Sequence, residues 1–177
     1  MLHWVFAYGS NMDLDDVERW CHERGHEPIR ILDAQVAELP GFALAWNYYS
    51  DARQGAAANV EERAGRSLPG LVLQVSATGL GVLDRKEGHP KRYRRRLLRV
   101  VTAKESAPSP PRAFGESGAA RAPDAAAMDA WVYQVQPEFL RPQPQHPTST
   151  YVNIMLRAAE RHGFPGWYLR ELRALLR

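Results

Sequence analysis

Val5-Phe6-Ala7-Tyr8-Gly9-Ser10-Asn11-Met12, close to the start of the chain, is an apolar stretch that breaks into a small polar loop. A strand that runs through a glycine loop into a helix presents backbone N–H groups and a hydroxyl to an anionic ligand. The alternative interpretation is an ordinary turn, because Gly, Ser and Asn are common in turns of every kind. The stretch therefore predicts a strand followed by either a binding loop or a plain turn.

A helix is predicted directly after this loop. Asp13 and Asp16 suit its first turn, because carboxylates there offset the unpaired backbone N–H groups. Gly25 is suited to ending it. Four apolar residues recur at helical spacing between these positions and form one stripe: Leu14, Val17, Trp20 and Cys21.

Short strand-like segments dominate the rest of the first half of the chain and return later. They cover residues 29–38, 42–50, 57–62, 70–75, 93–102 and 130–135. Turn signals separate the first four segments at Pro40-Gly41, Gly55 and Pro69-Gly70. Successive short strands of this kind favour a mixed sheet or a barrel.

Three more helices are predicted. The first covers residues 77–87, although two glycines within it weaken the pattern. The second runs from Thr148 or Ser149, either of which can cap it, to His162. The last follows a turn at residues 163–166, and its exposed apolar positions lead us to expect a homodimer.

Residues 104–129 differ in composition from the rest of the chain. They are rich in Ala, Pro, Gly, Ser and Arg without apolar periodicity, so they cannot bury enough apolar surface to offset the entropy of ordering. We interpret them as a mobile insertion, because the segment 130–135 returns as a strand that can join the same sheet. A length of 177 residues suits a single domain over residues 1–177.

The bulk composition argues against several classes of partner. The net charge of +3 at pH 7 is small and both signs are interspersed, so neither a nucleic acid nor a membrane is expected as a partner. The chain start lacks a signal-peptide pattern and no segment approaches the roughly 20 apolar residues that span a bilayer, so we expect a cytoplasmic protein. Cys21 is the one cysteine and is expected to be a buried structural thiol. The six histidines are scattered, and no metal site is expected.

Glu87 is the acidic residue that stands out. It lies where a predicted helix meets a loop, with Leu80 and Leu83 preceding it on the buried side. Burial against apolar surface raises the pKa of a carboxyl group and suits it to moving protons near neutrality. The alternatives are that Glu87 pairs with Lys91 or is simply solvated, and that Asp84 plays this role instead.

Three motifs follow one another along the chain: Phe6-Ala7-Tyr8-Gly9-Ser10-Asn11-Met12, Leu83-Asp84-Arg85-Lys86-Glu87-Gly88 followed by Tyr93, and Pro147-Thr148-Ser149-Thr150-Tyr151. In this order and spacing they resemble the γ-glutamylcyclotransferase family, over nearly the whole chain apart from residues 104–129. The resemblance implies an α+β fold, built on a small mixed β-barrel with flanking α-helices and an active-site cavity at one end. One departure is His89-Pro90-Lys91-Arg92, where members often carry a glycine shortly before the residue that matches Tyr93.

The resemblance also implies an activity and a set of site residues. In that family the α-amine of a γ-glutamyl group attacks its own γ-carbonyl, releasing 5-oxoproline and the attached amine or amino acid, without a metal or an organic cofactor. The implied catalytic residue is Glu87, acting first as a base and then as an acid. Backbone N–H groups of residues 8–11 suit either the carbonyl oxyanion or the α-carboxylate of the small-molecule substrate. The implied substrate-binding residues are Val5, Phe6, Ala7, Tyr8, Gly9, Ser10, Asn11, Tyr93 and Tyr151.

Three alternatives stay open. A member of this fold can bind a γ-glutamyl ligand without turning it over, because fold does not guarantee activity. The basic segment of residues 91–99 could grip RNA, although alternate side chains of a strand point to opposite faces and a salt-bridged strand is favoured. No quoted residue identifies the leaving amine, which could be an amino acid, a glutathione-derived peptide, a polyamine or a natural product. The Tyr8-Gly9-Ser10-Asn11 opening is closer to the branch acting on γ-glutamyl amino acids or related amides than to the glutathione-specific branch.

Overall fold

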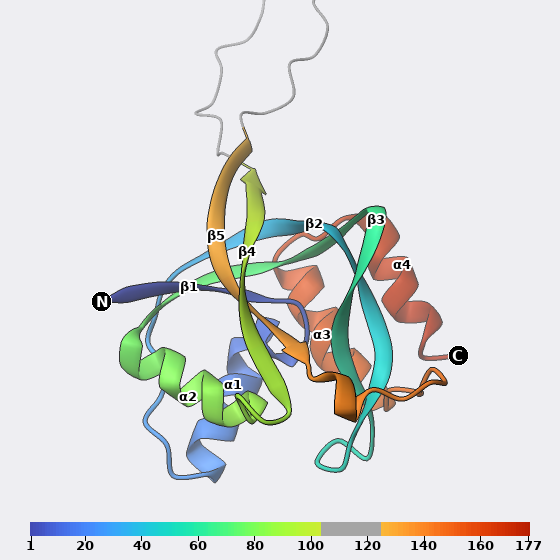
Figure 1. The fold of residues 1–177 in the computed structure, drawn as a ribbon, viewed down its shortest axis with the longest axis horizontal. Helices are drawn as coiled ribbons and strands as arrows, with labels where there is room; N and C mark the ends of the chain where they lie inside the picture. Colours follow the sequence, from blue (N-terminus) through green and yellow to red (C-terminus); the bar gives the residue numbers. More distant parts are fainter. Residues whose placement is uncertain (104–124) are drawn as a thin grey trace, which may run out of the picture.

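The computed structural model of the chain describes residues 1–103 and 125–177 and centres on a closed β-barrel. Its strands are β1 (Leu2–Ala7), β2 (Ile31–Ser50), β3 (Gly55–Ser76), β4 (Tyr93–Ala103) and β5 (Ala125–Val135). Their order around the barrel is β1-β3-β2-β4-β5 (Figure 1). Because β1 pairs antiparallel with β3 and parallel with β5, the sheet is mixed. With the helices around it, this is the predicted α+β fold.

Two of the predicted breaks between strands are wrong. Strand β2 is continuous through Pro40-Gly41, where Gly41 has a φ of +79° and the register with β3 shifts. Strand β3 is likewise continuous through Gly70, where an added Cβ would collide with the Phe6 ring. Gly41 thus marks a bulge, and Gly70 marks a close approach between strands. The turn predicted at Gly55 is present, because β3 begins at this residue. The result is one long bent hairpin that wraps around the barrel.

All four predicted helices are present. They are α1 (Leu14–Glu23), α2 (Ala77–Glu87), α3 (Ser149–Arg161) and α4 (Gly166–Ala174), with short 3₁₀ turns at Ser10–Met12 (η1) and Pro137–Phe139 (η2). Asp13 caps α1 by accepting hydrogen bonds from the backbone N–H groups of Asp15 and Asp16, at 3.1 and 3.3 Å. Thr148 caps α3 by accepting one from Tyr151 N at 3.3 Å. Caps of this kind are worth about 1 kcal/mol each and explain where these helices begin.

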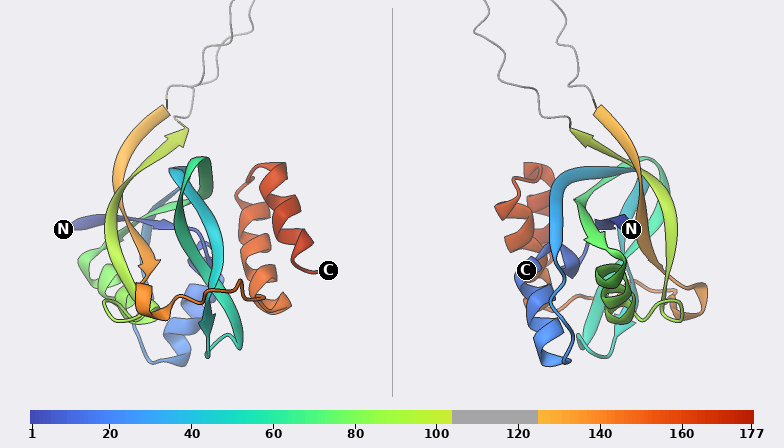
Figure 2. Two further views of the ribbon diagram at one scale, coloured as in Figure 1. Left: turned by 45° about the vertical axis from the view of Figure 1, so that its right-hand side comes forward. Right: turned by 90° about the vertical axis from the view of Figure 1, so that its left-hand side faces the viewer.

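The helices lie against different parts of the barrel. Helices α1 and α2 lie together near one end, and α3 and α4 pack side by side along the β2–β3 hairpin (Figures 1 and 2). Val17 and Cys21 of α1 contact Val82 of α2 in a small buried cluster. Cys21 is fully buried, as predicted for a structural thiol. The loop that follows β1 therefore enters a corner bordered by α1, α2 and the start of α3.

The segment predicted as an insertion falls mainly outside the described residues. Its last five residues, 125–129, instead belong to β5, where Ala127 pairs with Val101 and Asp129 with Arg99. Backbone pairing with β4 extends this strand five residues before its predicted start. Trp167 and Leu176, near the C-terminus, are each 39% exposed, and the homodimer stays a prediction. No helix in the described parts of the chain is long and apolar enough to span a membrane.

Candidate functional site

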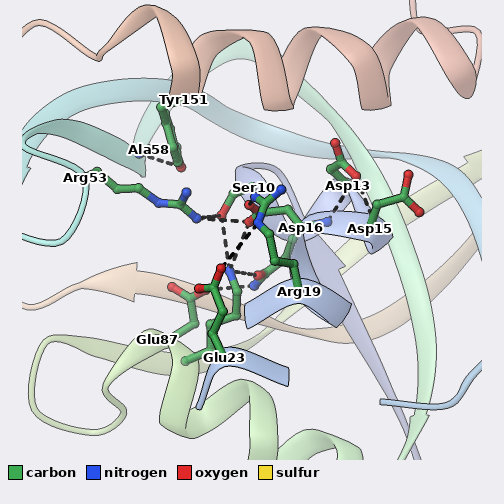
Figure 3. Close-up of polar contacts among 12 residues, drawn as sticks. Ser10, Asp13, Asp15, Asp16, Arg19, Glu23, Arg53, Ala58, Glu87 and Tyr151 are labelled. Atoms are coloured by element: carbon green, nitrogen blue, oxygen red, sulfur yellow. Dashed lines mark hydrogen bonds and ion pairs between the residues drawn. The ribbon is translucent and has the colours of Figure 1, made fainter. Parts of the chain in front are cut away.

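A cavity of about 530 Å³ opens where the loop after β1, the end of α2, the β2–β3 turn and the start of α3 meet (Figure 3). Its wall contains nine of the predicted site residues: Phe6, Ala7, Tyr8, Gly9, Ser10, Asn11, Glu87, Tyr93 and Tyr151. Val5 is not in the wall. Its side chain is 1% exposed in the barrel core, where the strand pairs with β3 at Leu73. Val5 lies outside the wall because the motif begins inside the strand, before the chain reaches the cavity, and its part in substrate binding stays a prediction.

The loop after β1 is held in a tight turn. Met12 N donates to Gly9 O, and Asp13 N donates to Ser10 O, both at 3.1 Å. The first N–H groups of such a turn have no partner within it, so the loop directs backbone donors outward. Gly9 is required here, because an added Cβ would stand 2.9 Å from the Tyr151 hydroxyl oxygen. The loop therefore lines the cavity, and its part in binding stays a prediction.

Glu87 faces this loop. It is the last residue of α2, which ends at Gly88 with a φ of +66°, and its Oε1 accepts a hydrogen bond of 2.8 Å from Asn11 Nδ2. The sequence predicts that this carboxylate lies against apolar surface. In the structure a polar amide also contacts it. No ion pair joins it to Lys91 among the described residues. The helix end thus brings one carboxylate into hydrogen-bonding contact with the glycine loop.

Asp84, the alternative acid, has a structural position. Its Oδ1 accepts a hydrogen bond of 2.7 Å from the Tyr133 hydroxyl and lies 3.3 Å from Arg95 Nε. Asp84 is not part of the cavity wall. Three residues before Glu87 on the same helix, it ties α2 to strands β4 and β5. Of the two candidate acids, only Glu87 can contact a ligand in the cavity.

Three buried tyrosines form a hydroxyl-lined side of the cavity. Tyr93 OH donates to Ala58 O at 2.9 Å, and Tyr151 OH accepts from Ala58 N at 3.2 Å. Tyr8 OH donates to a backbone carbonyl of β5. Burial raises the pKa of all three hydroxyls, and the negative charge of Glu87 adds to the rise. They therefore stay protonated near neutral pH.

An ionic network behind the loop was not predicted from the sequence. The Asp16 carboxylate is 3% exposed and pairs with Arg53 at 3.0 Å and with Arg19 (Figure 3). Arg53 also donates to Ser10 Oγ at 3.2 Å. Asp16 had been interpreted only as a first-turn residue of α1. Its partner Arg53 lies in the β2–β3 turn, and nothing in the local sequence of either residue signals that the two meet.

Lys86 belongs to the same network. Its side chain is 5% exposed, with Nζ 3.3 Å from Ser10 Oγ, 2.9 Å from Asn11 Oδ1 and 3.8 Å from Asp16 Oδ2. Burial lowers the pKa of Lys86, while the charges of Glu87 and Asp16 partly counter that effect. In the sequence Lys86 is one basic residue of a charged helix end and gives no sign of burial.

Positive charge dominates the cavity wall. The wall contains three carboxylates, Asp16, Glu23 and Glu87. It contains seven cationic residues: Arg19, Arg24, Arg53, Arg85, Lys86, Lys91 and Arg92. A smaller cavity of about 290 Å³ adjoins it and shares Tyr48 and Arg92 with its wall. The excess of cations favours a ligand with net negative charge.

The wall of the main cavity contains no histidine or cysteine. Within residues 1–103 and 125–177, no group of three His, Cys, Asp or Glu side chains comes together as a metal site would require. The groups that line the cavity are hydroxyls, amides, cations and one loop-facing carboxylate, which can form hydrogen bonds and ion pairs with a small organic anion.

Half of the basic residues in the segment 91–99 pair with acids of the same chain. Arg95 also lies over the Trp131 ring, 5.0 Å from its centroid. Three ion pairs are formed: Arg95 with Asp84, Arg96 with Glu62, and Arg99 with Asp129. This is the salt-bridged strand favoured above, and the absence of a nucleic-acid partner stays a prediction.

The sequence matches a known family over most of its length. The family model described as Gamma-glutamyl cyclotransferase, AIG2-like matches residues 5–153. This range contains every predicted site residue, from Val5 to Tyr151. No curated protein matches the chain by sequence.

Solved structures share the fold. One is a gamma-glutamyl cyclotransferase, 20% identical, with a TM-score of 0.72 over 98% of this chain and 88% of that one. Another is uncharacterized protein loc79017 from Homo sapiens, 21% identical, with a TM-score of 0.69 over 98% and 87% of the two chains. A yeast gamma-glutamyl cyclotransferase specific to glutathione is 15% identical, with a TM-score of 0.59 over 99% and 94%. At these identities the likeness shows the fold, and the family match confirms the resemblance found in the sequence.

Proposed function

Because the chain belongs to the gamma-glutamyl cyclotransferase, AIG2-like family, we propose that it is an enzyme that releases 5-oxoproline from a small γ-glutamyl compound. The observation that carries the proposal is the contact of Glu87 with the glycine loop, where Asn11 Nδ2 lies 2.8 Å from Glu87 Oε1. One proton acceptor opposite a set of backbone donors is what an intramolecular acyl transfer requires.

Glu87 would carry the proton through both halves of the reaction. It first takes a proton from the substrate α-ammonium group, which frees the amine lone pair. The amine attacks the γ-carbonyl carbon, a new C–N bond forms, and negative charge moves to the carbonyl oxygen. When the tetrahedral intermediate collapses, Glu87 returns its proton to the leaving nitrogen, the old C–N bond breaks and the carbonyl re-forms. The ring nitrogen gives its second proton to the freed Glu87 carboxylate, which passes it to the released amine. General acid–base catalysis of this kind contributes about 10²–10⁴-fold to a rate.

The loop would supply the donors. Ser10 Oγ accepts hydrogen bonds from both Lys86 Nζ and Arg53 Nη2, so its own proton is free to donate to a ligand. Backbone N–H groups of the loop can stabilise the oxyanion or bind the substrate α-carboxylate, and both placements are compatible with the proposal. In either case the donors do not need to reorganise during the reaction, because the turn and the ionic network behind it already hold them.

We further propose that the leaving amine carries a carboxylate, as in a γ-glutamyl amino acid. Arg24, Lys91 and Arg92 border the main cavity and are exposed to an incoming ligand. No ion pair holds Arg24, Lys91 or Arg92 among the described residues. The adjoining smaller cavity, which shares Arg92, offers further volume on that side. Unpaired cations favour an anionic leaving group over a neutral γ-glutamylamine.

The test is a panel of γ-glutamyl compounds incubated with the purified protein, with 5-oxoproline and the freed amine measured together. We expect equal amounts of both products and a loss of at least about 100-fold in Glu87→Gln. Glu23→Gln is the matched control, because Glu23 also borders the cavity but its side chain is 60% exposed and pairs with Arg19 at 4.0 Å. Its rate should stay within about threefold of the wild-type rate.

Two outcomes would contradict the proposal. Product release that survives in Glu87→Gln would remove Glu87 from the reaction. Calorimetric binding of a γ-glutamyl compound without any 5-oxoproline would favour the alternative, a member of this fold that binds the ligand and does not turn it over.

A further inference from the structure

We propose that Lys86 is a positioning residue, which fixes the side-chain amide of Asn11 so that its Nδ2 always faces the carboxylate of Glu87. The inference rests on the proposed function only in taking Glu87 as the proton carrier. It concerns a residue of the cavity wall that acts through its neighbour Asn11.

The argument begins with three side chains in a row. Lys86 Nζ lies 2.9 Å from Asn11 Oδ1, and Asn11 Nδ2 lies 2.8 Å from Glu87 Oε1. An ammonium group has only donors and a carboxylate has only acceptors, whereas an amide has one side of each kind. Only one orientation of the Asn11 amide satisfies both neighbours. The reverse orientation would place donor against donor at Lys86 and acceptor against acceptor at Glu87.

Lys86 is itself held firmly enough to impose this choice. Its side chain is 5% exposed, and it has further partners in Ser10 Oγ at 3.3 Å and Asp16 Oδ2 at 3.8 Å. Consecutive residues of a helix diverge by about 100°, so Lys86 and Glu87 leave α2 in different directions. Both nonetheless reach Asn11, which bridges them from the opposite loop. The two residues at the end of α2 thus hold the Asn11 amide in place, Lys86 at its oxygen and Glu87 at its nitrogen. We call this arrangement the clamp.

The clamp has a consequence for catalysis. A carboxylate that accepts a hydrogen bond is stabilised in its ionised form, which is the form that takes the first proton. Without Lys86 the Asn11 amide can rotate and present Oδ1 to Glu87, an arrangement that only a protonated carboxyl group tolerates. Removal of Lys86 should therefore make Glu87 bind its proton at a higher pH.

Other groups around Glu87 do not obscure this effect. Burial raises the pKa of the tyrosines on this side of the cavity, so they are uncharged below pH 8. Asp16 pairs with Arg53 and Arg19, and Glu23 pairs with Arg19. The other cations of the wall are Arg24, Arg85, Lys91 and Arg92. The groups that feel the charge of Glu87 are Lys86 on the same helix and Tyr8, Tyr48, Tyr93, Tyr133 and Tyr151 on the surrounding elements, and Arg53 and Arg92 share the cavity wall with it.

The test compares Lys86→Met with Lys86→Gln. Both variants lose the positive charge, but the glutamine amide can still donate to Asn11 Oδ1 and the methionine thioether cannot. The Glu87 carboxyl is titrated by ¹³C NMR in the full chain, with Glu87→Gln used to assign its signal. We expect the midpoint in Lys86→Met to lie about one pH unit above that of the wild type, and the midpoint in Lys86→Gln to lie between the two.

The pH dependence of the kinetics is a second measurement. The acid limb of kcat/KM should move by the same amount as the NMR midpoint, while KM changes less than about threefold, because the Lys86 ammonium group is engaged by Ser10, Asn11 and Asp16. The NMR titration needs no turnover. If no γ-glutamyl compound is converted, the proposed function fails while the titration still decides the role of Lys86.

Two results would overturn the inference. One is an unchanged Glu87 midpoint in Lys86→Met, and the other is an equal shift in the Met and Gln variants, which would assign the effect to charge alone. Should Lys86→Met fail to fold, as judged by circular dichroism, the wild type provides its own test. The two side-chain amide protons of Asn11 must then follow the Glu87 titration, and an amide that ignores it contradicts the clamp.

Discussion

The hydroxyl oxygen of Tyr151 lies 2.9 Å from the point that a Cβ on Gly9 would occupy, and the Ala58 Cβ lies 3.2 Å from it. The loop after β1 is thus packed directly against the start of α3 and the inner side of β3. Contacts this short leave no room for a methyl group, so the loop must move if one is added. The position of the backbone donors depends on a glycine at this residue.

Gly9→Ala should therefore lower kcat/KM by at least about tenfold, because misplaced donors stabilise the oxyanion poorly. Gly81→Ala is the matched control. Gly81 lies within α2 and nothing lies within 4 Å of its added Cβ, so alanine there should stabilise the fold by about 0.5–1 kcal/mol and leave the kinetics unchanged. Steady-state kinetics with thermal unfolding of both variants measures the two effects. A fully active Gly9→Ala would contradict the role given to the loop.

Tyr151→Phe should lower the free energy of unfolding by about 1–3 kcal/mol, because Ala58 N–H would lose its buried acceptor. Tyr168→Phe is the matched change in the same helical layer. Tyr168 OH is buried without a hydrogen-bond partner in the described parts of the chain, so its removal should be neutral or stabilising. Urea unfolding of the two variants gives the comparison. Equal losses in both would mean that the hydrogen bond to Ala58 adds nothing.

The cationic border of the cavity predicts a charge-dependent effect on substrate choice. The double variant Arg24→Gln with Lys91→Gln should raise KM for a γ-glutamyl compound with an anionic leaving group by about fivefold or more, since a charge contact in water is worth about 1 kcal/mol. KM for a neutral γ-glutamylamide should change little, and added salt should reduce the difference. Arg170→Gln, an exposed change on α4, is the control. An equal rise for both substrates would remove the basis for an anionic leaving group.

Lys86 predicts a pH dependence of stability. Burial lowers its pKa from 10.5, so the folded chain binds this proton more weakly than the unfolded chain does. Between the lowered pKa and 10.5 the unfolded state holds more protons, and the wild type gains stability as the pH rises through this window. Lys86→Met lacks that gain. The difference in free energy of unfolding, Lys86→Met minus wild type, should fall as the pH is raised toward 10.5, as measured by urea unfolding at several pH values. A difference that grows with pH would contradict the lowering of the Lys86 pKa by burial.

Local patterns in the sequence were enough to place the helices and the ends of the glycine loop. Caps, apolar spacing and terminal glycines act within one or two turns, so Asp13 and Gly88 mark helix ends without reference to the rest of the chain. Strand lengths were predicted less well. Pro40-Gly41 and Gly70 carry the same local signals as a turn, and whether they form a turn, a bulge or a close approach depends on the strand beside them.

The sequence by itself determined the helices, the family and the pairing of one acidic residue with one glycine loop, because each depends on residues close together or on motifs of fixed order. Only the tertiary structure decided that Val5 stays in the core, that Asp84 is bound to Tyr133, and that Lys86 and Arg53 reach the loop from behind. Those contacts join residues that are tens of positions apart. The closure of the barrel decides which of these distant residues come into contact. The charge or hydrogen-bonding capacity of a residue does not predict which distant group will lie opposite it.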